Sequence, residues 1–183
     1  MKKIVTPVFR VSFPNVFQPR GFEGQKEKYS VVMLFSKEDK EELKALSSLL
    51  EEAAREKWPD DAKRKAIMSS KLFKYPLRDG DAEKPDMDGY PGCFFASATA
   101  KAERRPGLVD DTLQPIIDSE QFYGGCYARA TITAYAFDVA GNKGVAFGLQ
   151  NIMKVRDGEP FGFRSTPEND FADFANNKEA LFG

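Results

Sequence analysis

One stretch of the sequence alternates small apolar residues with aromatic, cationic and hydroxyl residues. Between positions 126 and 137 the small set is Cys126, Ala128, Ala130, Ile132, Ala134 and Ala136, and the other set is Tyr127, Arg129, Thr131, Thr133, Tyr135 and Phe137. Successive side chains of a β-strand point to opposite faces, so the second set would share one surface. Such a surface can stack bases on its rings and hold phosphates with its cations and hydroxyls.

The segment 94–101 repeats this alternation and runs into a group of cations. Phe95, Ser97, Thr99 and Lys101 alternate with an aromatic residue and three alanines, and two arginines follow shortly after. We predict that both segments form a surface for single-stranded nucleic acid, with rings stacking bases and cations contacting phosphates. The predicted site is Phe95, Thr99, Lys101, Arg104, Arg105, Tyr127, Arg129 and Tyr135. The alternative is that these side chains pack under a loop or helix, because aromatic residues and threonine favour strands.

The residue types argue against catalysis. Histidine is absent, which excludes Ser-His and Cys-His nucleophiles and His-ligated metals. The two cysteines, Cys93 and Cys126, cannot form a zinc site alone, and we expect reduced thiols. Glycine-rich phosphate-binding motifs and a nucleophile elbow are also missing. The sequence therefore predicts a protein that is not an enzyme, with no cofactor and no metal.

One catalytic alternative stays open. The segment 76–92 is rich in Gly, Pro and Asp, and long loops within domains are often functional. A metal-dependent nuclease can be built from carboxylates and a lysine. The candidates for it are Asp79, Asp81, Lys84, Asp86 and Asp88.

Composition indicates a soluble globular chain. Of its 183 residues, 42% are hydrophobic and 30% charged, and 27 basic residues nearly balance 28 acidic ones. The longest strictly apolar run, Val31 to Phe35, is far shorter than the roughly 20 residues that span a bilayer. We predict a cytoplasmic protein with no membrane partner.

Periodicity predicts the elements that position these side chains. A helix should open at Ser36, with Asp39 completing a capping box, and Leu and Ala at helical spacing continue it to Trp58. The side chains on the inner strand face are small, which suits a tightly curved sheet that closes into a barrel. The expected strands are 4–17, 29–35, 94–101, 123–138 and 145–155; the expected loops are 17–28 and 76–92, with a turn at 141–144 and a shorter helix at 61–71.

The C-terminal segment, residues 165–183, differs from the rest. It carries a net charge of −3, whereas residues 1–164 carry +2. Acidic segments with spaced aromatic residues can bind basic, apolar pockets of partners or the protein's own DNA groove. The candidate residues are Asp170, Phe171, Asp173, Phe174 and Phe182. The alternative is a short terminal helix with Phe171 and Phe174 packed on the body of the protein, residues 1–164.

The order of several short motifs carries a resemblance. These are RVSFPNVF at 10–17, KYSV at 28–31, LRDGD at 77–81, GCFFASA at 92–98, RPGLVD at 105–110, YGGCYARA at 123–130 and KGVAFGL at 143–149. Over residues 8–164 the series resembles phage-encoded single-stranded-DNA-binding proteins with an OB-fold. The resemblance implies a mainly β, five-stranded OB barrel with an inserted helix at about 37–57, and no catalysis. It also implies a role in phage replication or recombination, and an acidic C-terminus that recruits replication proteins.

We therefore expect a binding domain at residues 1–164 and a flexible acidic tail at 165–183. The predicted function is single-stranded DNA binding, largely independent of base sequence, in the cytoplasm of an infected or lysogenic host. Phage or host replication proteins are the expected partners of the tail, and a homodimer is left open. The alternatives are a virion structural or assembly protein and the carboxylate nuclease.

Overall fold

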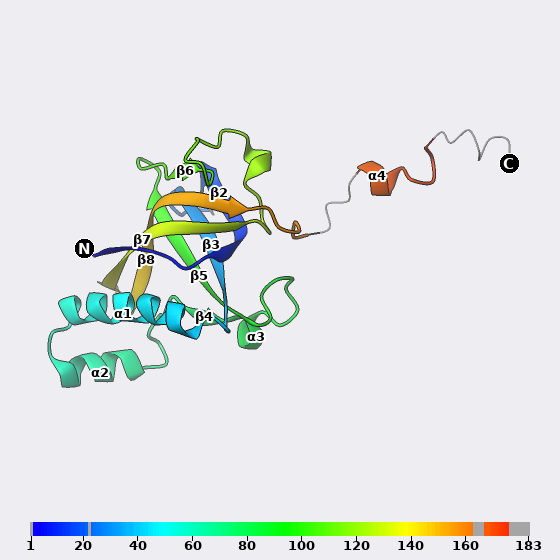
Figure 1. Ribbon diagram of the computed structural model, residues 1–183. Coiled ribbons are helices and arrows are strands. Elements are labelled where there is room, and N and C mark those ends of the chain that lie inside the picture. Colours follow the sequence, from blue (N-terminus) through cyan, green and yellow to red (C-terminus); the bar gives the residue numbers. More distant parts are fainter. Residues whose placement is uncertain (1, 22, 163–166, 176–183) are drawn as a thin grey trace, which may run out of the picture.

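The computed structural model describes residues 2–21, 23–162 and 167–175 (Figure 1). Its long strands are β2 (Phe9–Arg20), β3 (Lys28–Ser36), β5 (Cys93–Lys101), β7 (Tyr127–Val139) and β8 (Asn142–Arg156). Its short strands are β1 (Lys3–Val5), β4 (Arg78–Asp79) and β6 (Gly107–Val109). The helices are α1 (Lys40–Lys57), α2 (Asp61–Ser69), α3 (Gly80–Glu83) and α4 (Pro167–Asp170), with a 3₁₀ turn at Ser119–Gln121. No helix of the described residues is long and apolar enough to cross a membrane.

The five long strands close into a barrel. Their order is β7-β2-β3-β5-β8, and β8 pairs with β7 to complete the ring. The β5–β8 contact is parallel, and the other four contacts of the ring are antiparallel. This confirms the predicted mainly β, OB-type barrel.

The barrel interior is filled by the small side chains that alternation assigned to it. Cys126, Ala128, Ala130, Ile132 and Ala134 of the β7 region are all at most 6% exposed. Ala96 and Ala98 of β5 are buried in the same core. Small inner residues let a strongly curved sheet close around a narrow core, which is the reason for the pattern.

Helix α1 closes one end of the barrel, as Figure 1 shows. Its apolar stripe of leucines and alanines is buried against the barrel core. The predicted start was wrong, because Ser36 still belongs to β3, where it pairs with Cys93, and the helix begins at Lys40. The capping box does not form: Asp39 makes no side-chain cap, and Ser36 Oγ accepts from the Glu38 N–H instead.

The β2–β3 hairpin is longer than predicted. Residues 17–28 were expected to be a loop, but β2 continues to Arg20, which pairs with Lys28. Pro14 and Pro19 are accommodated because the β2–β3 register shifts between Ser12 and Asn15 and again before Arg20. The hairpin therefore projects beyond the barrel and carries charged side chains with it.

Two further boundaries differ from the prediction. The turn between β7 and β8 is Ala140–Gly141, where both residues have positive φ, as the tightest hairpins require. The segment 76–92 contains β4 and α3, and β4 pairs with the first half of β5. Residues 78–90, here called the strap, pack over the outer face of β3 and β5, where Tyr90 and Met87 join Leu34 and Phe95 in one apolar cluster.

Candidate nucleic-acid interface

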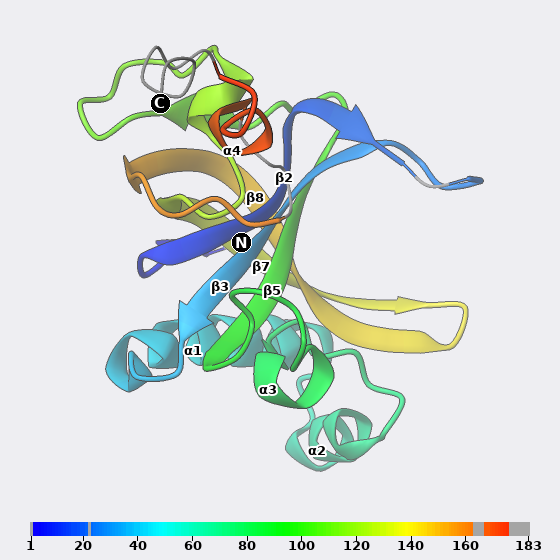
Figure 2. The ribbon, with the colours of Figure 1, turned by 90° about the vertical axis from the view of Figure 1, so that its right-hand side faces the viewer.

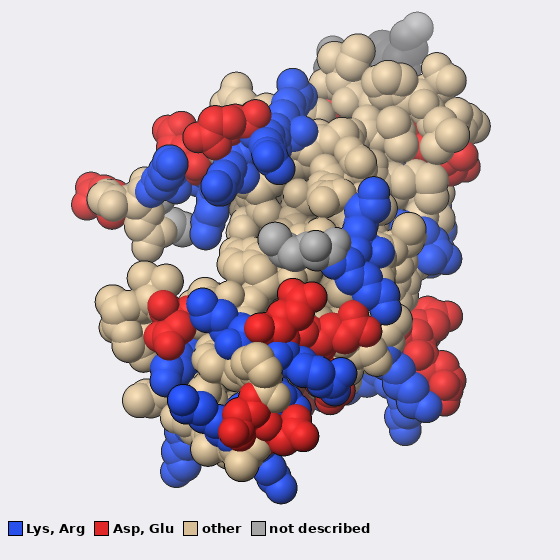
Figure 3. Space-filling model, turned by 90° about the vertical axis from the view of Figure 1, so that its left-hand side faces the viewer, with Lys and Arg blue, Asp and Glu red and all other residues tan. Residues whose placement is uncertain are grey.

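The β2–β3 and β7–β8 hairpins project from the same side of the barrel (Figure 2). Figure 3 views the molecule from the opposite side and shows a gap between the two arms, with Lys and Arg side chains beside several Asp and Glu side chains on the upper-left arm, the β2–β3 hairpin. A groove of about 810 Å³ is lined by the segment 73–79, by β5 and by the β7–β8 hairpin, and Lys28 is its one lining residue from the β2–β3 hairpin. We call it the hairpin groove; Lys28, Ser97, Thr99 and Tyr135 are among its lining residues.

Two tyrosines give the hairpin groove its accessible rings. Tyr135 of β7 is 39% exposed, and Tyr75, from the segment before the strap, is 38% exposed. Burial raises the pKa of the Tyr75 hydroxyl, and its hydrogen bond with Ser47 of α1 partly offsets that shift, so the hydroxyl is directed at α1. Half-exposed rings of this kind can stack bases.

Phe95 occupies a different position from the one expected. It lies on the outer face of β5, but its ring is 6% exposed. The Arg78 guanidinium lies 5.2 Å from the ring centre, and the Tyr90 ring packs edge-on at 5.2 Å. Both neighbours belong to the strap, so Phe95 anchors the strap and offers no open surface for a base.

A row of cations includes Lys28, which lines the hairpin groove. Arg20 pairs with Lys28 between β2 and β3, and Lys28 pairs with Lys101 between β3 and β5. Directly opposed like charges destabilise a sheet unless an anion sits between them. Arg104 and Arg105 are exposed just beyond Lys101. These five residues make one basic ridge on three neighbouring strands and the turn after β5, where Glu103 also lies and pairs with Lys26 of the hairpin at 4.0 Å.

Tyr127 and Arg129 lie away from the hairpin groove. Tyr127 is eight residues from Tyr135 on the same face of β7, a distance of about 26 Å along an extended strand. Its ring contacts Arg156, whose guanidinium lies 4.0 Å from the ring centre. Arg129 Nη1 donates to the Thr6 carbonyl oxygen at 3.2 Å. The structure thus places the predicted residues in two groups.

The strap holds the acids considered for a nuclease. Lys37 Nζ donates to Asp79 Oδ1 at 2.6 Å and to Asp81 Oδ2 at 2.7 Å. These bonds hold the pKa of both carboxyls below its ordinary value and raise the pKa of Lys37. Within the described ranges, no cluster of three or more His, Cys, Asp or Glu side chains is arranged to hold a metal.

The tail residues that the structure describes are exposed. Phe171 is 62% and Phe174 is 81% exposed, and Asp170 and Asp173 are also on the surface. Figure 1 shows α4 apart from the barrel, so these rings are not packed on the body in this structure. Phe182 lies outside the described residues.

Sequence reasoning missed several residues of these surfaces. Arg20 and Lys28 were assigned to a loop or its edge, and their opposition became visible only with the hairpin register. Tyr75 precedes the strap with no periodic neighbours. Arg156 faces Tyr127 across β7–β8, a pairing hidden by two irregularities in the register.

A known protein family and a phage protein are similar to this chain over nearly its whole length. The model of a protein family described as the ssDNA-binding protein of Enterobacter phage Enc34 matches residues 2–181. Protein p50 of Acyrthosiphon pisum secondary endosymbiont phage 1 is 31% identical over 179 residues, which cover 94% of this chain and 95% of p50.

Solved structures show the same fold. The single-stranded DNA-binding protein of bacteriophage Enc34 in complex with ssDNA superposes with a TM-score of 0.71 at 24% identity, covering 87% of this chain and 89% of that one. The bacteriophage T7 single-stranded DNA-binding protein gp2.5 gives 0.62 at 13% identity, covering 91% and 98%. With a family model matching nearly its whole length, the chain belongs to the Enc34 family of phage ssDNA-binding proteins.

Proposed function

We propose that this protein binds single-stranded DNA without catalysis and largely without sequence preference, during phage replication or recombination in the host cytoplasm. The observation that carries the proposal is the basic ridge of Arg20, Lys28 and Lys101 leading into the hairpin groove. Opposed cations cost the free protein stability, and a phosphate backbone crossing them relieves that cost. Family membership supports the same reading.

The hairpin groove suits a single strand better than a duplex. In OB-folds the outer face of the second and third barrel strands, between the two flanking hairpin loops, is where oligonucleotides bind. Here those strands are β3 and β5, and the flanking loops are the tips of β2–β3 and β7–β8. Tyr75 and Tyr135 offer rings to base faces, which a duplex hides. Ring stacking accepts any base, so little sequence preference is expected.

The phosphates and bases have separate places in this arrangement. Lys28, Lys101, Arg104 and Arg105 lie on the ridge, where they can follow the backbone of the strand. The Thr99 hydroxyl, on the groove wall, can donate to a phosphate oxygen. Tyr135 contributes the stacking surface, and Phe95 supports the strap beside it.

The test is binding of labelled oligo-dT and of a matching duplex, with and without magnesium. Tyr135→Ala should weaken oligo-dT binding by about 1–3 kcal/mol because it removes a stacking ring. Lys101→Ala should reduce the slope of log affinity against log salt by about 0.7. It should not lower the melting temperature, because it removes a like-charge pair. Lys65→Ala, an exposed lysine on α2, is the matched control and should change neither.

Three results would contradict the proposal. Equal affinity for duplex and single strand at moderate salt would exclude the stacking role. Magnesium-dependent loss of the oligonucleotide would favour the nuclease. A stable oligomer without DNA affinity would favour a virion assembly protein.

A further inference from the structure

Four side chains outside the hairpin groove form an arginine–aromatic cluster on the outer face of the barrel. The cluster consists of Arg10, Tyr127, Arg156 and Phe161. The Arg156 guanidinium lies 4.0 Å from the Tyr127 ring centre. The Arg10 guanidinium lies 5.8 Å from that ring and 4.0 Å from the Phe161 ring. Planar cations and rings therefore alternate over β8, β7, β2 and the segment after β8.

The two arginines carry charge that the protein does not neutralise with carboxylates. Arg10 Nε donates to the Gly125 carbonyl at 3.1 Å, and a second nitrogen donates to the Glu159 carbonyl at 2.7 Å. Both acceptors are neutral, so they fix the guanidinium in place and leave its charge. Neither Arg10 nor Arg156 forms an ion pair within the described chain, and the nearby Asp157 is bound by Lys154 at 2.6 Å.

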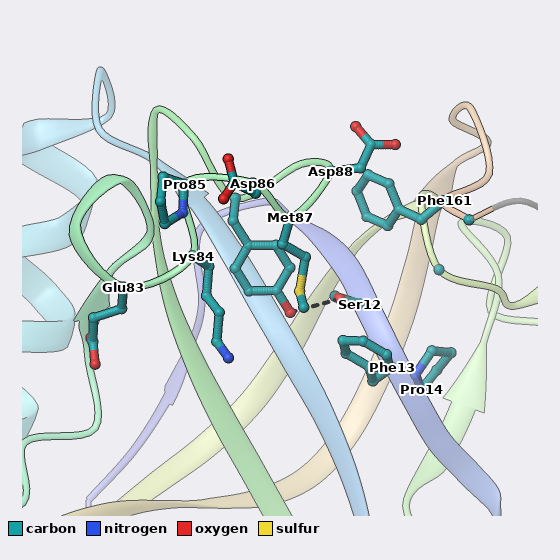
Figure 4. A pocket seen from close by; sticks show the side chains of 13 residues that line it. Ser12, Phe13, Pro14, Glu83, Lys84, Pro85, Asp86, Met87, Asp88 and Phe161 are labelled. Carbon is teal, nitrogen blue, oxygen red and sulfur yellow. Dashed lines mark hydrogen bonds between the residues drawn. The ribbon is translucent and has the colours of Figure 1, made fainter.

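A cavity lies between this cluster and the hairpin groove, on the other side of the strap. It has a volume of about 680 Å³ and includes Phe161 of the cluster and Glu83 of the strap, which also lines the hairpin groove. Figure 4 shows Phe13, Met87 and Phe161 around the cavity. Two further lining residues, Ser12 and Tyr90, are joined by a hydrogen bond of 2.9 Å between their hydroxyls. The groove and the cavity thus lie on the two sides of the strap, and the cavity reaches the cluster at Phe161.

The cavity itself is apolar with acids on its rim. Phe13 is 59% exposed and has a φ of +44°, a backbone conformation rarely adopted by a bulky residue. That conformation presents its ring to the cavity mouth. Asp86 and Asp88 stand on the outer rim in Figure 4, where they would repel phosphates. Lys84 also lines the cavity, and further cations lie at the two ends of this path, in the basic ridge and in the arginine–aromatic cluster.

We propose that the arginine–aromatic cluster is a second contact surface for the same single strand of DNA. Phosphates contact Arg10 and Arg156, and a base stacks on the exposed arginine–ring surface, since guanidinium planes and rings both accept base faces. A strand long enough to fill the hairpin groove passes the apolar cavity and ends on the cluster. This inference rests on the proposed function, because it extends the same DNA path.

Length dependence tests the inference. Tyr127 and Tyr135 are about 26 Å apart along β7, so a short strand cannot reach both surfaces. We would compare labelled oligo-dT of about 4 and about 16 nucleotides, the two ends of the OB-fold range of site sizes. Arg156→Ala should weaken binding of the longer strand about fivefold or more and lower its salt slope by about 0.7, with the shorter strand unaffected.

Matched variants separate stacking, charge and folding. Arg156→Lys should restore the salt slope but not the full affinity, because an ammonium keeps the charge without the planar stack. Arg55→Ala, an exposed arginine on α1, should leave both strands unaffected. Melting temperatures of all variants should stay close to that of the parent protein, because Arg156 and Arg55 are exposed and a cation–ring contact at an exposed site adds little stability.

The experiment distinguishes failure of the second contact surface from failure of the proposed function. If the parent protein binds neither strand, the proposed function fails and the inference fails with it. If the parent protein binds both strands and Arg156→Ala binds the longer one with unchanged affinity, only the inference is overturned. Equal weakening for both lengths would also overturn it, since the cluster would then belong to the first site.

Discussion

Ala130 shows how a single methyl group defines the inside of this barrel. It is 2% exposed on the inner face of β7, while its neighbours Arg129 and Thr131 face outward. Interiors are packed as densely as organic crystals, so three extra carbon atoms have no space to occupy.

We expect Ala130→Leu to lower the free energy of unfolding by about 1–3 kcal/mol through overpacking. The same change at Ala66, exposed on α2, is the control and should alter stability by less than about 0.5 kcal/mol. Urea denaturation of the two variants measures the difference. An unchanged midpoint for Ala130→Leu would mean that the inner face has room that the structure does not show.

At the scale of single residues, the sequence predicted the strand face on which a side chain lies but not whether another segment buries that side chain. Alternation placed Ala130 inside and Tyr135 outside because strand side chains must alternate. It also placed Phe95 on the outer face, correctly, but it could not indicate that the strap folds back over that ring. Whether an outward residue is exposed depends on a segment distant in sequence, and periodicity carries no information about that contact.

At the scale of elements, the strap depends on a polar anchor. Lys37, just after β3, bridges Asp79 and Asp81 at the start of the strap, and Asp81 Oδ1 also accepts from the Gly92 N–H at 3.0 Å. The strap is also held by an apolar contact between Tyr90 and Phe95. The strap separates the hairpin groove from the neighbouring cavity, so its stability affects the shape of both.

The ion pairs of Lys37 with Asp79 and Asp81 stabilise the strap over a defined pH range. The folded-state pKa values of Asp79 and Asp81 lie below the ordinary 3.8, so their contribution is fully present above that pH and is lost as pH falls through the lowered values. The pKa of Lys37 lies above the ordinary 10.5, so its contribution is lost only as pH rises through the raised value.

We expect the stability difference between the parent protein and Lys37→Met to be constant between these limits and to shrink beyond each. Chemical denaturation across a pH series measures it. Lys44→Met breaks an exposed pair with Glu41 on α1 and serves as the control. A difference for Lys37→Met that does not change below pH 3.8 would show that the carboxylates are not the partners that matter.

Elements with strong local signals were predictable, and those formed by pairing were not. The leucine stripe indicated α1, and the alternation indicated β5 and β7. The outer half of β2 contains Pro14, Pro19 and two register shifts, so its strand character comes from pairing with β3. The basic ridge was incomplete in the sequence for the same reason, because Arg20 and Lys28 meet only in that hairpin.

The whole molecule is divided by charge. Residues 165–183 carry −3 and residues 1–164 carry +2. We propose that the body is the binding domain and the tail a separate acidic segment. Phe171 and Phe174 are exposed where the structure describes them, which favours a tail that reaches other surfaces over one packed as a terminal helix. The basic ridge and the arginine–aromatic cluster are the cationic surfaces such a tail could occupy.

Deleting residues 165–183 should therefore strengthen single-strand binding and make it more salt-dependent. A tail on cationic sites reduces the number of phosphates that the protein can neutralise, and each recovered contact should steepen the salt slope by about 0.7. The gain should be largest at low salt, where the tail and the body attract each other most, and the two forms should converge at high salt. Affinity and melting temperature of both forms across a salt series measure this.

A full-length variant with Asp170 and Asp173 changed to Asn should show part of the same gain, which separates charge from length. If truncation instead lowers the melting temperature and leaves affinity unchanged, the tail is a structural part of the body, and the partner role of Phe171 and Phe174 fails with it.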